Sequence, residues 1–120
     1  MKINKKILLA EDELLIAKVL CLQFAKLGFE VQNVSDAGDV FETVIQMQPD
    51  VIVLDVQLKN KSSGIDAAKK IREAGITTPI IFTTGNSYSI TLQNINDISD
   101  SKILSKPVEF ETLLRLINQL

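Results

Sequence analysis

Apolar residues along the chain alternate between short, nearly unbroken runs and longer stretches with helical spacing. Unbroken apolar runs are typical of strands buried on both faces of a parallel sheet, and stretches with apolar residues three and four positions apart are typical of amphipathic helices. The predicted strands are residues 7–10, 29–34, 51–54, 79–83 and 101–105. The predicted helices lie between them and after the last, over residues 14–27, between Asp36 and Pro49, between Gly64 and Gly75, over residues 86–101 and over residues 109–120.

Strands that alternate with helices predict an α/β fold, in which a parallel sheet is covered by helices on both faces. We expect one domain over residues 1–120, with its core at about residues 6–118. The fourth predicted helix, at residues 86–101, is rich in Ser, Asn and Thr and has a thin apolar stripe, so we expect it to be short and weak.

Composition narrows the chemistry of the protein. With 46% hydrophobic and 23% charged residues in 120, the chain is neither disordered nor fibrous. It has one cysteine and no histidine, which excludes an internal disulfide, Cys/His zinc sites and every mechanism that needs a histidine. No apolar run reaches the roughly 18 residues of a membrane span, and the first residues lack the apolar stretch of a signal peptide, so we expect a cytoplasmic protein without a membrane partner. The net charge of −2 argues against direct nucleic acid binding.

Polar side chains stand where the predicted strands end. Glu11 and Asp12 follow the first strand, and Asp55 ends the third. Thr84 ends the fourth strand and Lys106 follows the fifth. Because the carboxyl ends of parallel strands lie at one edge of a sheet, where ligands bind in such folds, we expect these side chains to converge if the strands are wound in the order 2-1-3-4-5.

Such a cluster predicts a particular chemistry. Carboxylates about 5 Å apart repel one another by roughly 3 kcal/mol per pair at an effective dielectric constant near 20, so Glu11, Asp12 and Asp55 need a compensating cation. Mg²⁺ (or Mn²⁺) prefers oxygen ligands and shares phosphate oxygens, and a lysine ammonium such as that of Lys106 also suits phosphate. The set is typical of a site at which a carboxylate becomes an acyl phosphate.

Four segments carry a resemblance to a known family. LLAEDE at residues 8–13, VLDVQL at 53–58, FTTG at 82–85 and LSKP at 104–107 together resemble the receiver domain of two-component response regulators. The resemblance covers residues 6–117. It implies a (βα)5 flavodoxin-like fold, a three-layer sandwich whose five parallel strands run in the order 2-1-3-4-5.

The resemblance also implies roles for the acidic residues. Asp55 would be the phospho-acceptor, taking its phosphoryl group from the phosphohistidine of a histidine kinase or a histidine phosphotransfer domain. Asp12 would bind Mg²⁺ directly and Glu11 mainly through water. Asp55 itself and the backbone carbonyl of Gln57 would complete the protein's share of the ligands.

Three residues of the later strands would take the remaining family roles. Thr84 would be the switch hydroxyl that moves onto the phosphoryl group, Lys106 would pair with that group, and Pro107 would follow a cis peptide bond. Phosphorylation would then alter the surface near residues 84–106. Such a protein is a signalling switch and not an enzyme in the ordinary sense, although it would hasten its own phosphorylation and dephosphorylation with Mg²⁺.

The chain departs from the common pattern of the family at three places. The loop after Asp55 is about one residue longer, with Lys59 where proline is common, a variation that a subgroup of receivers shares. Ile103 stands where an aromatic switch residue is usual. Gln57 and Asn86 occupy the positions that tune dephosphorylation in relatives.

The first predicted helix suggests a partner surface. Leu14, Lys18, Cys21 and Ala25 recur at helical spacing opposite a second stripe. That second stripe consists of Leu15, Val19, Leu22 and Phe24 and, if exposed, would suit docking by a helix of the phosphodonor. The downstream partner is either an unknown protein or a covalently linked output domain, and we leave a homodimer open.

Other interpretations stay open at this point. Glu11 and Asp12 could merely complement a helix dipole, and Asp55 could merely cap a turn. A receiver-like fold that no longer accepts phosphate would be a pure interaction module. An aspartyl-nucleophile phosphatase would need a second acid two residues after Asp55, where the chain has Gln57, and a flavin or nucleotide carrier would need a glycine-rich loop after the first strand, which is missing.

Overall fold

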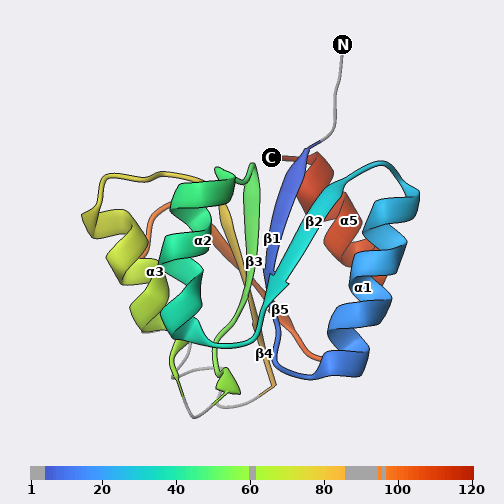
Figure 1. The fold of residues 1–120 in the computed structure, drawn as a ribbon, viewed down its shortest axis with the longest axis horizontal. Helices are drawn as coiled ribbons and strands as arrows, with labels where there is room; N and C mark the ends of the chain where they lie inside the picture. Colours follow the sequence, from blue (N-terminus) through green and yellow to red (C-terminus); the bar gives the residue numbers. More distant parts are fainter. Residues whose placement is uncertain (1–4, 60–61, 86–94, 96) are drawn as a thin grey trace.

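The computed structural model describes residues 5–59, 62–85, 95 and 97–120 (Figure 1). It contains the five predicted strands, β1 (Lys6–Ala10), β2 (Glu30–Val34), β3 (Val51–Asp55), β4 (Ile80–Thr84) and β5 (Ser101–Ser105). Its helices are α1 (Leu14–Lys26), the 3-10 turn η1 (Ala37–Asp39), α2 (Val40–Met47), α3 (Gly64–Glu73) and α5 (Phe110–Asn118). Most of the predicted helix at residues 86–101 lies outside the described residues.

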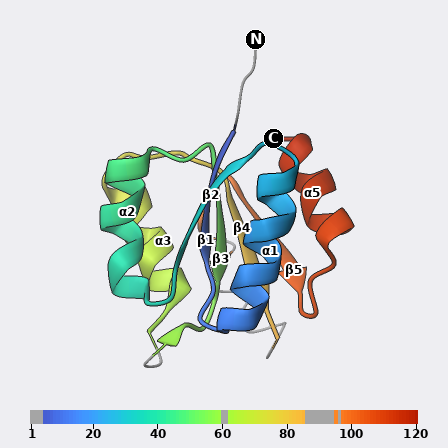
Figure 2. The same ribbon diagram turned by 45° about the vertical axis from the view of Figure 1, so that its right-hand side comes forward.

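The strands form one parallel sheet in the order β2-β1-β3-β4-β5, which confirms the predicted order. Helices α1 and α5 cover one face, and α2 and α3 cover the other (Figures 1 and 2). The central strand β3 is buried along its whole length, as its apolar run predicts. The fold is therefore the three-layer, flavodoxin-like sandwich that the strand pattern and the resemblance led us to expect.

The starts of η1 and α3 and the end of α3 follow local rules that can be read in the sequence. The Asp36 carboxylate accepts a hydrogen bond from the Gly38 backbone N–H at 2.8 Å, which caps η1. The single helix expected there is divided into η1 and α2. The Ser63 hydroxyl accepts from the Asp66 N–H at 3.2 Å and caps α3. Gly75, just after α3, has a φ of 81°, a left-handed conformation that favours glycine.

Two apolar cores lie on the two faces of the sheet. The core under α2 and α3 includes Leu8, Ile52 and Phe82, and the core under α1 and α5 includes Ile7, Val53 and Leu113. Phe24 is fully buried in the second core.

The burial of Phe24 corrects the predicted exposed stripe on α1. Its ring lies 5.6 Å from that of Phe29 and 4.9 Å from that of Phe110, measured between ring centroids. The three rings join α1 to α5 and to the residue before β2, so Phe24 belongs to the core and not to a docking face. The other members of its stripe, Leu15, Val19 and Leu22, are exposed.

Within the described residues, no helix combines the length and the apolar character that crossing a bilayer requires. All five strands run in the same direction, so their carboxyl ends meet at one edge of the sheet, at the bottom of Figure 1. That edge carries the candidate site.

Candidate functional site

The structure brings together the three predicted carboxylates. One oxygen from each of Glu11, Asp12 and Asp55 lies within 4.8 Å of the others. They meet because β1 and β3 are neighbours, with Ala10 in register with Leu54. Glu11 and Asp55 are each only 4% exposed, so their charges lie largely out of water. Asp12 is half-buried.

Lys106 contacts two of these carboxylates at once. Its Nζ lies 2.7 Å from Asp55 Oδ2 and 3.3 Å from Glu11 Oε1. Its backbone N–H donates to the Thr84 carbonyl at 2.8 Å, which ties the end of β5 to the end of β4. The Lys106–Pro107 peptide bond is cis, as the resemblance implies. The contact to Asp55 fits the expected convergence of these side chains, whereas the contact to Glu11 was not expected. The pairing of Lys106 with a phosphoryl group stays a prediction.

Backbone groups also support the carboxylates. The Glu13 N–H donates to Glu11 Oε2 at 3.0 Å, and the Gln57 N–H donates to Asp55 Oδ1 at 3.2 Å. Hydrogen bonds of this kind stabilise the ionised form and fix the direction of the side chain. They hold Glu11 and Asp55 toward the same point.

Burial dominates the ionisation of the two enclosed carboxylates. It raises the pKa of Asp55 and of Glu11, and the favourable contacts with Lys106 and with backbone N–H groups offset this only in part. Burial by itself would lower the pKa of Lys106, but the ion pairs with Asp55 and Glu11 outweigh it, so the pKa is raised. Burial outweighs the ion pairs for the carboxylates but not for the lysine, because the side chains of Glu11 and Asp55 are only 5% and 6% exposed, whereas that of Lys106 is 23% exposed. The ammonium is therefore firmly charged, while the carboxylates still lack full compensation.

Two threonines end β4 at the same edge. Thr84, the predicted switch hydroxyl, and Thr83 are both 5% exposed. Thr83 is the register partner of Asp55 on the neighbouring strand, and its carbonyl accepts from the Val56 N–H at 2.9 Å. Sequence reasoning singled out Thr84 alone, because only the sheet register shows that Thr83 lies beside Asp55 at the end of β3.

The loop after Asp55 is held by short-range contacts. Gln57 forms an antiparallel bridge with Ser63, and the Leu58 N–H donates to the Ser62 carbonyl at 2.9 Å. The Lys59 N–H reaches the Ser35 carbonyl at 3.2 Å, which joins this loop to the turn after β2. The longer loop is thus anchored on both sides in the part of it that is described.

Gly64, the first residue of α3, lies directly against the backbone of Asp55. Its N–H donates to the Val56 carbonyl at 2.8 Å. A Cβ atom on Gly64 would lie 2.1 Å from the Asp55 carbonyl oxygen and 3.2 Å from Leu54 Cγ. Only a residue without a side chain fits here, and the sequence alone did not indicate this role.

Two positions at which the chain departs from the common family pattern are Ile103 and Asn86. Ile103, where the family usually has an aromatic residue, is half-buried and packs against the core under α2 and α3. Asn86 lies outside the described residues.

The donor set suits a hard divalent cation. Carboxylate oxygens are the ligands that Mg²⁺ and Mn²⁺ prefer, and Mg²⁺ needs only one or two of them because it keeps several of its waters. Two of the three carboxylates are buried, and their raised pKa values show that added positive charge would stabilise their ionised forms. The residues present therefore fit such an ion.

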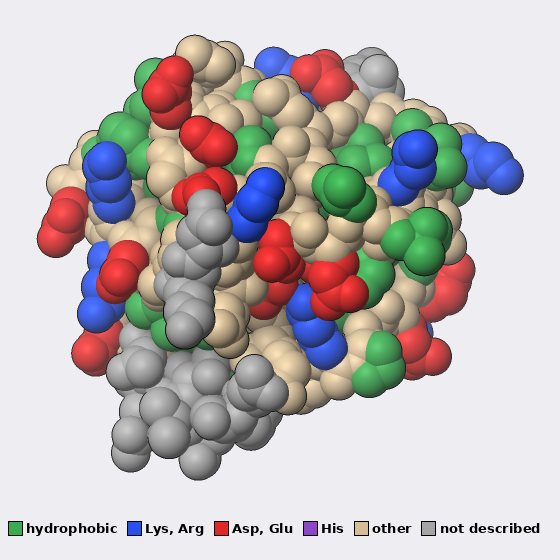
Figure 3. Space-filling view, turned by 60° about the horizontal axis from the view of Figure 1, so that its bottom comes forward, with side chains coloured by type: hydrophobic (Ala, Val, Ile, Leu, Met, Phe, Trp, Pro, Cys, Tyr) green, Lys and Arg blue, Asp and Glu red, His purple; other side chains and the backbone are tan. Residues whose placement is uncertain are grey.

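An apolar surface on α1 borders the site. Its residues with large exposed side chains are Leu14, Leu15, Ile16, Val19 and Leu22, with exposed fractions between 40% and 77%. A groove of about 790 Å³ runs from Leu15 and Val19 past Glu11 and Lys106 to Phe110 on α5. Figure 3, which views the molecule from the site end, shows acidic side chains near the middle of this face and hydrophobic ones to their right. The acidic cluster is thus continuous with an apolar surface.

Comparisons with known proteins agree on one family. The family model of the response regulator receiver domain matches residues 7–118. The transcriptional regulatory protein DltR of Streptococcus agalactiae is 35% identical over 93% of this chain and 50% of its own length. The chain therefore spans about half the length of this relative.

Solved structures give the same result. The receiver domain of the Francisella response regulator 1452 superposes with a TM-score of 0.86 at 26% identity, over 97% of this chain and 95% of that one. The receiver domain of the sensor histidine kinase PA1611 of Pseudomonas aeruginosa, solved with a magnesium ion coordinated in its active site cleft, superposes with a TM-score of 0.84 at 27% identity, over 98% of this chain and 97% of that one.

Proposed function

Because the chain belongs to the family of response regulator receiver domains, we propose that Asp55 is the residue at which it accepts a phosphoryl group. The family makes the chain a signal receiver of the two-component kind. The observation that supports the choice of Asp55 is its position: it is buried at the end of the central strand, beside two other carboxylates and in contact with Lys106.

The reaction that we propose is a phosphoryl transfer. An oxygen of the Asp55 carboxylate forms a bond to phosphorus, and the phosphorus–nitrogen bond of a partner's phosphohistidine breaks, leaving its electron pair on the imidazole nitrogen. The Gln57 N–H and Lys106 Nζ hold the two carboxylate oxygens in place through their hydrogen bonds. The transfer is thereby reduced largely to positioning and charge compensation.

We propose that the carboxylates of Glu11, Asp12 and Asp55 and the backbone carbonyl of Gln57 hold Mg²⁺ or Mn²⁺ at this site. Such an ion, when bound, offsets the negative charge of the carboxylates and of the incoming phosphoryl oxygens. The clustered oxygens support this proposal, as does the magnesium ion in the similar receiver domain of PA1611.

The switch that follows would involve the ends of β4 and β5. A phosphoryl group adds roughly −1.5 to −2 charge, which attracts the Lys106 ammonium and offers acceptor oxygens to the Thr84 hydroxyl. We propose that these movements change the surface near residues 84–106. The same residues would hasten both phosphorylation and dephosphorylation of Asp55, without making the chain an enzyme for other substrates.

A direct experiment tests the acceptor. The chain is incubated with acetyl phosphate and Mg²⁺, and its mass is measured for the wild type, for Asp55→Asn and for Asp66→Asn, a control at an exposed carboxylate in the first turn of α3. We expect one added phosphate on the wild type and on Asp66→Asn, and none on Asp55→Asn. A phosphorylated Asp55→Asn protein would contradict the assignment, and an unreactive wild type would favour a pure interaction module.

The apolar surface on α1 is the face that we propose for a histidine kinase or a histidine phosphotransfer domain. Leu14 is 77% exposed near the acidic cluster, whereas Leu27, 55% exposed, follows the other end of the helix. Leu14→Glu should slow transfer from a donor domain that phosphorylates the wild type, but leave labelling by acetyl phosphate intact, and Leu27→Glu should affect neither. Unchanged transfer from the donor to Leu14→Glu would refute this role.

We further propose that residues 6–118 form a single receiver core that acts in the cytoplasm. Its output is either a separate protein or a domain of the same polypeptide. The similar protein DltR is named a transcriptional regulatory protein, and the match covers half of its length. This supports an output domain on the same polypeptide.

A further inference from the structure

Asn33, on the edge strand β2, contacts the segment that carries the acidic pair. Its Nδ2 donates to the Glu11 carbonyl oxygen at 3.2 Å. The Glu11 N–H in turn donates to the Val34 carbonyl at 3.0 Å. The backbone of Glu11 is therefore held from β2 at both of its polar groups, once by the main chain and once by the Asn33 side chain.

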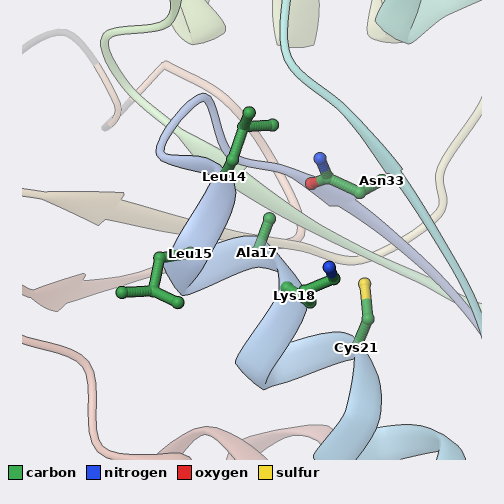
Figure 4. Close-up of a pocket in the computed structure, with 6 residues that line it drawn as sticks. All are labelled: Leu14, Leu15, Ala17, Lys18, Cys21 and Asn33. Atoms are coloured by element: carbon green, nitrogen blue, oxygen red, sulfur yellow. The ribbon is translucent and has the colours of Figure 1, made fainter.

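The other end of the same carboxamide has no partner. Asn33 Oδ1 is buried and accepts no hydrogen bond, the one buried side-chain nitrogen or oxygen in this condition among the described residues. Figure 4 shows the carboxamide facing Leu14 and Ala17 across a hollow of about 490 Å³ that Lys18 and Cys21 also line. Rotating the amide by half a turn would set its oxygen against the Glu11 carbonyl, so the contact to Glu11 fixes the orientation and leaves Oδ1 unpaired.

An unpaired buried oxygen weakens a fold, and an apolar side chain of similar size would avoid that cost. Asn33 faces an apolar hollow next to α1, where leucine would be the simpler occupant. What asparagine provides at this position, and leucine would not, is the hydrogen bond to the Glu11 carbonyl oxygen.

That contact matters because the acidic pair lies outside regular structure. Glu11 and Asp12 belong to the short connection between the end of β1 and the start of α1, and Glu13, the N-cap residue of α1, makes no side-chain capping hydrogen bond. β2 ends at Val34, so the sheet extends no further alongside this connection. The hydrogen bond from the Asn33 side chain therefore holds Glu11, the first residue after β1, to β2.

We propose that Asn33 is a positioning residue for the cation site: by fixing the Glu11–Asp12 peptide it directs both carboxylates toward Asp55. This inference rests on the proposed function, since it assigns Asn33 to the site that Mg²⁺ would occupy. Groups that orient metal ligands in this way typically change metal affinity by ~10–100-fold when they are removed. Asn33 touches no reacting atom, so its effect is on binding of the ion and not on the transfer step.

The test uses Asn33→Leu, which removes the donor and the unpaired oxygen together, and Gln32→Leu as the control. Gln32 is the neighbouring residue on β2, is exposed and points to the other face of the sheet. The Mg²⁺ dissociation constant is measured by calorimetry on the whole chain, the unfolding midpoint is measured without Mg²⁺, and labelling by acetyl phosphate is followed at increasing Mg²⁺.

We expect Asn33→Leu to bind Mg²⁺ about tenfold more weakly, within the range for groups that orient metal ligands, while its unfolding midpoint is equal to or higher than that of the wild type. Its labelling rate should return to the wild-type value at saturating Mg²⁺. Gln32→Leu should match the wild type in affinity and rate. Asn33→Ala, which adds no apolar bulk, supplies the same measurement if Asn33→Leu does not fold.

Three outcomes overturn the inference. An affinity within twofold of the wild type in the Asn33 variants would refute it alone and leave the proposed function intact. A loss of affinity that only follows a lower unfolding midpoint would make Asn33 a structural residue. A wild-type chain that binds no Mg²⁺ would refute the proposed function as well.

Discussion

Replacing Gly64 by alanine should disable the site through a single methyl group. In an exposed helix position this change normally stabilises a protein, because alanine is favoured over glycine in helices by up to about 1 kcal/mol. At Gly64 the methyl carbon would lie 2.1 Å from the carbonyl oxygen of Asp55 and 3.0 Å from its carbonyl carbon. Carbon and oxygen atoms in contact need more than about 3 Å, so the two backbones must separate by about 1 Å.

The size of the effect follows from that displacement. Forcing extra volume into a packed region typically costs about 1–3 kcal/mol, which exceeds the gain in helix propensity. The atoms that must move belong to Asp55, and a misplacement of about 1 Å at a reacting group can slow a reaction about 100-fold. We therefore expect Gly64→Ala to lose about 1–2 kcal/mol of stability and about 100-fold in the rate of labelling by acetyl phosphate.

Gly75→Ala is the matched control at the other end of the same helix. Gly75 has a φ of 81°, and an added methyl carbon would have no atom within 4 Å beyond its chain neighbours, so alanine there is strained by its own backbone but touches nothing. It should lose about 1–2 kcal/mol of stability and keep the wild-type labelling rate. Urea denaturation gives the stabilities, and mass spectrometry over time gives the rates.

The comparison separates loss of stability from loss of geometry. If both variants are folded and equally destabilised, only Gly64→Ala should label slowly. A Gly64→Ala protein that is labelled at the wild-type rate would show that the close packing of α3 against Asp55 does not set the geometry of the acceptor.

Three further predictions concern charge and packing. Because burial raises the pKa of Asp55, the wild-type chain should lose stability as the pH rises from the ordinary pKa of 3.8 through the raised pKa of the folded state. Urea denaturation without metal should therefore find Asp55→Asn more stable than the wild type at pH 7, but not in acid. Lys106→Met removes the cation that contacts Glu11 and Asp55, so it should cost about 1–2 kcal/mol at pH 7 without metal, and Mg²⁺ should raise its unfolding midpoint more than that of the wild type. Phe24→Ala should cost about 3–5 kcal/mol because Phe24 packs against Phe110, while Mg²⁺ affinity measured by calorimetry should stay unchanged. A stabilising effect of Lys106→Met, or a Phe24→Ala variant as stable as the wild type, would contradict the respective argument.

The sheet could be predicted from the sequence because its strands are buried. Residues 51–54 are an unbroken apolar run, and the structure places them in the central strand with helices on both sides. The site follows from the sheet, since Glu11, Asp55 and Lys106 come directly at or after strand ends, and parallel strands bring such positions to one edge. The apolar runs and the topology of a parallel sheet are therefore sufficient to predict the sheet and the edge at which the site lies.

Contacts between side chains that are far apart in the sequence could not be predicted from the spacing of apolar and polar residues. Phe24 was grouped with the exposed stripe of α1, but helical spacing sets it on the face of Ala17 and Leu20, the other buried residues of the helix, where the rings of Phe29 and Phe110 pack against it. Neither the second contact of Lys106, with Glu11, nor the close approach of Gly64 to Asp55 has a signal in the spacing of residues. Asn33 looks like an ordinary polar residue of an edge strand until its amide is seen to reach the neighbouring strand's end.

The double contact of Lys106 has a consequence for which ions the site should admit. At neutral pH the four side chains Glu11, Asp12, Asp55 and Lys106 carry formal charges that leave two negative charges uncancelled. A divalent ion balances that remainder, whereas potassium or sodium would leave half of it. The charge that Lys106 leaves on the site would therefore favour a divalent ion over the monovalent ions of a cell, without a cavity that encloses the ion.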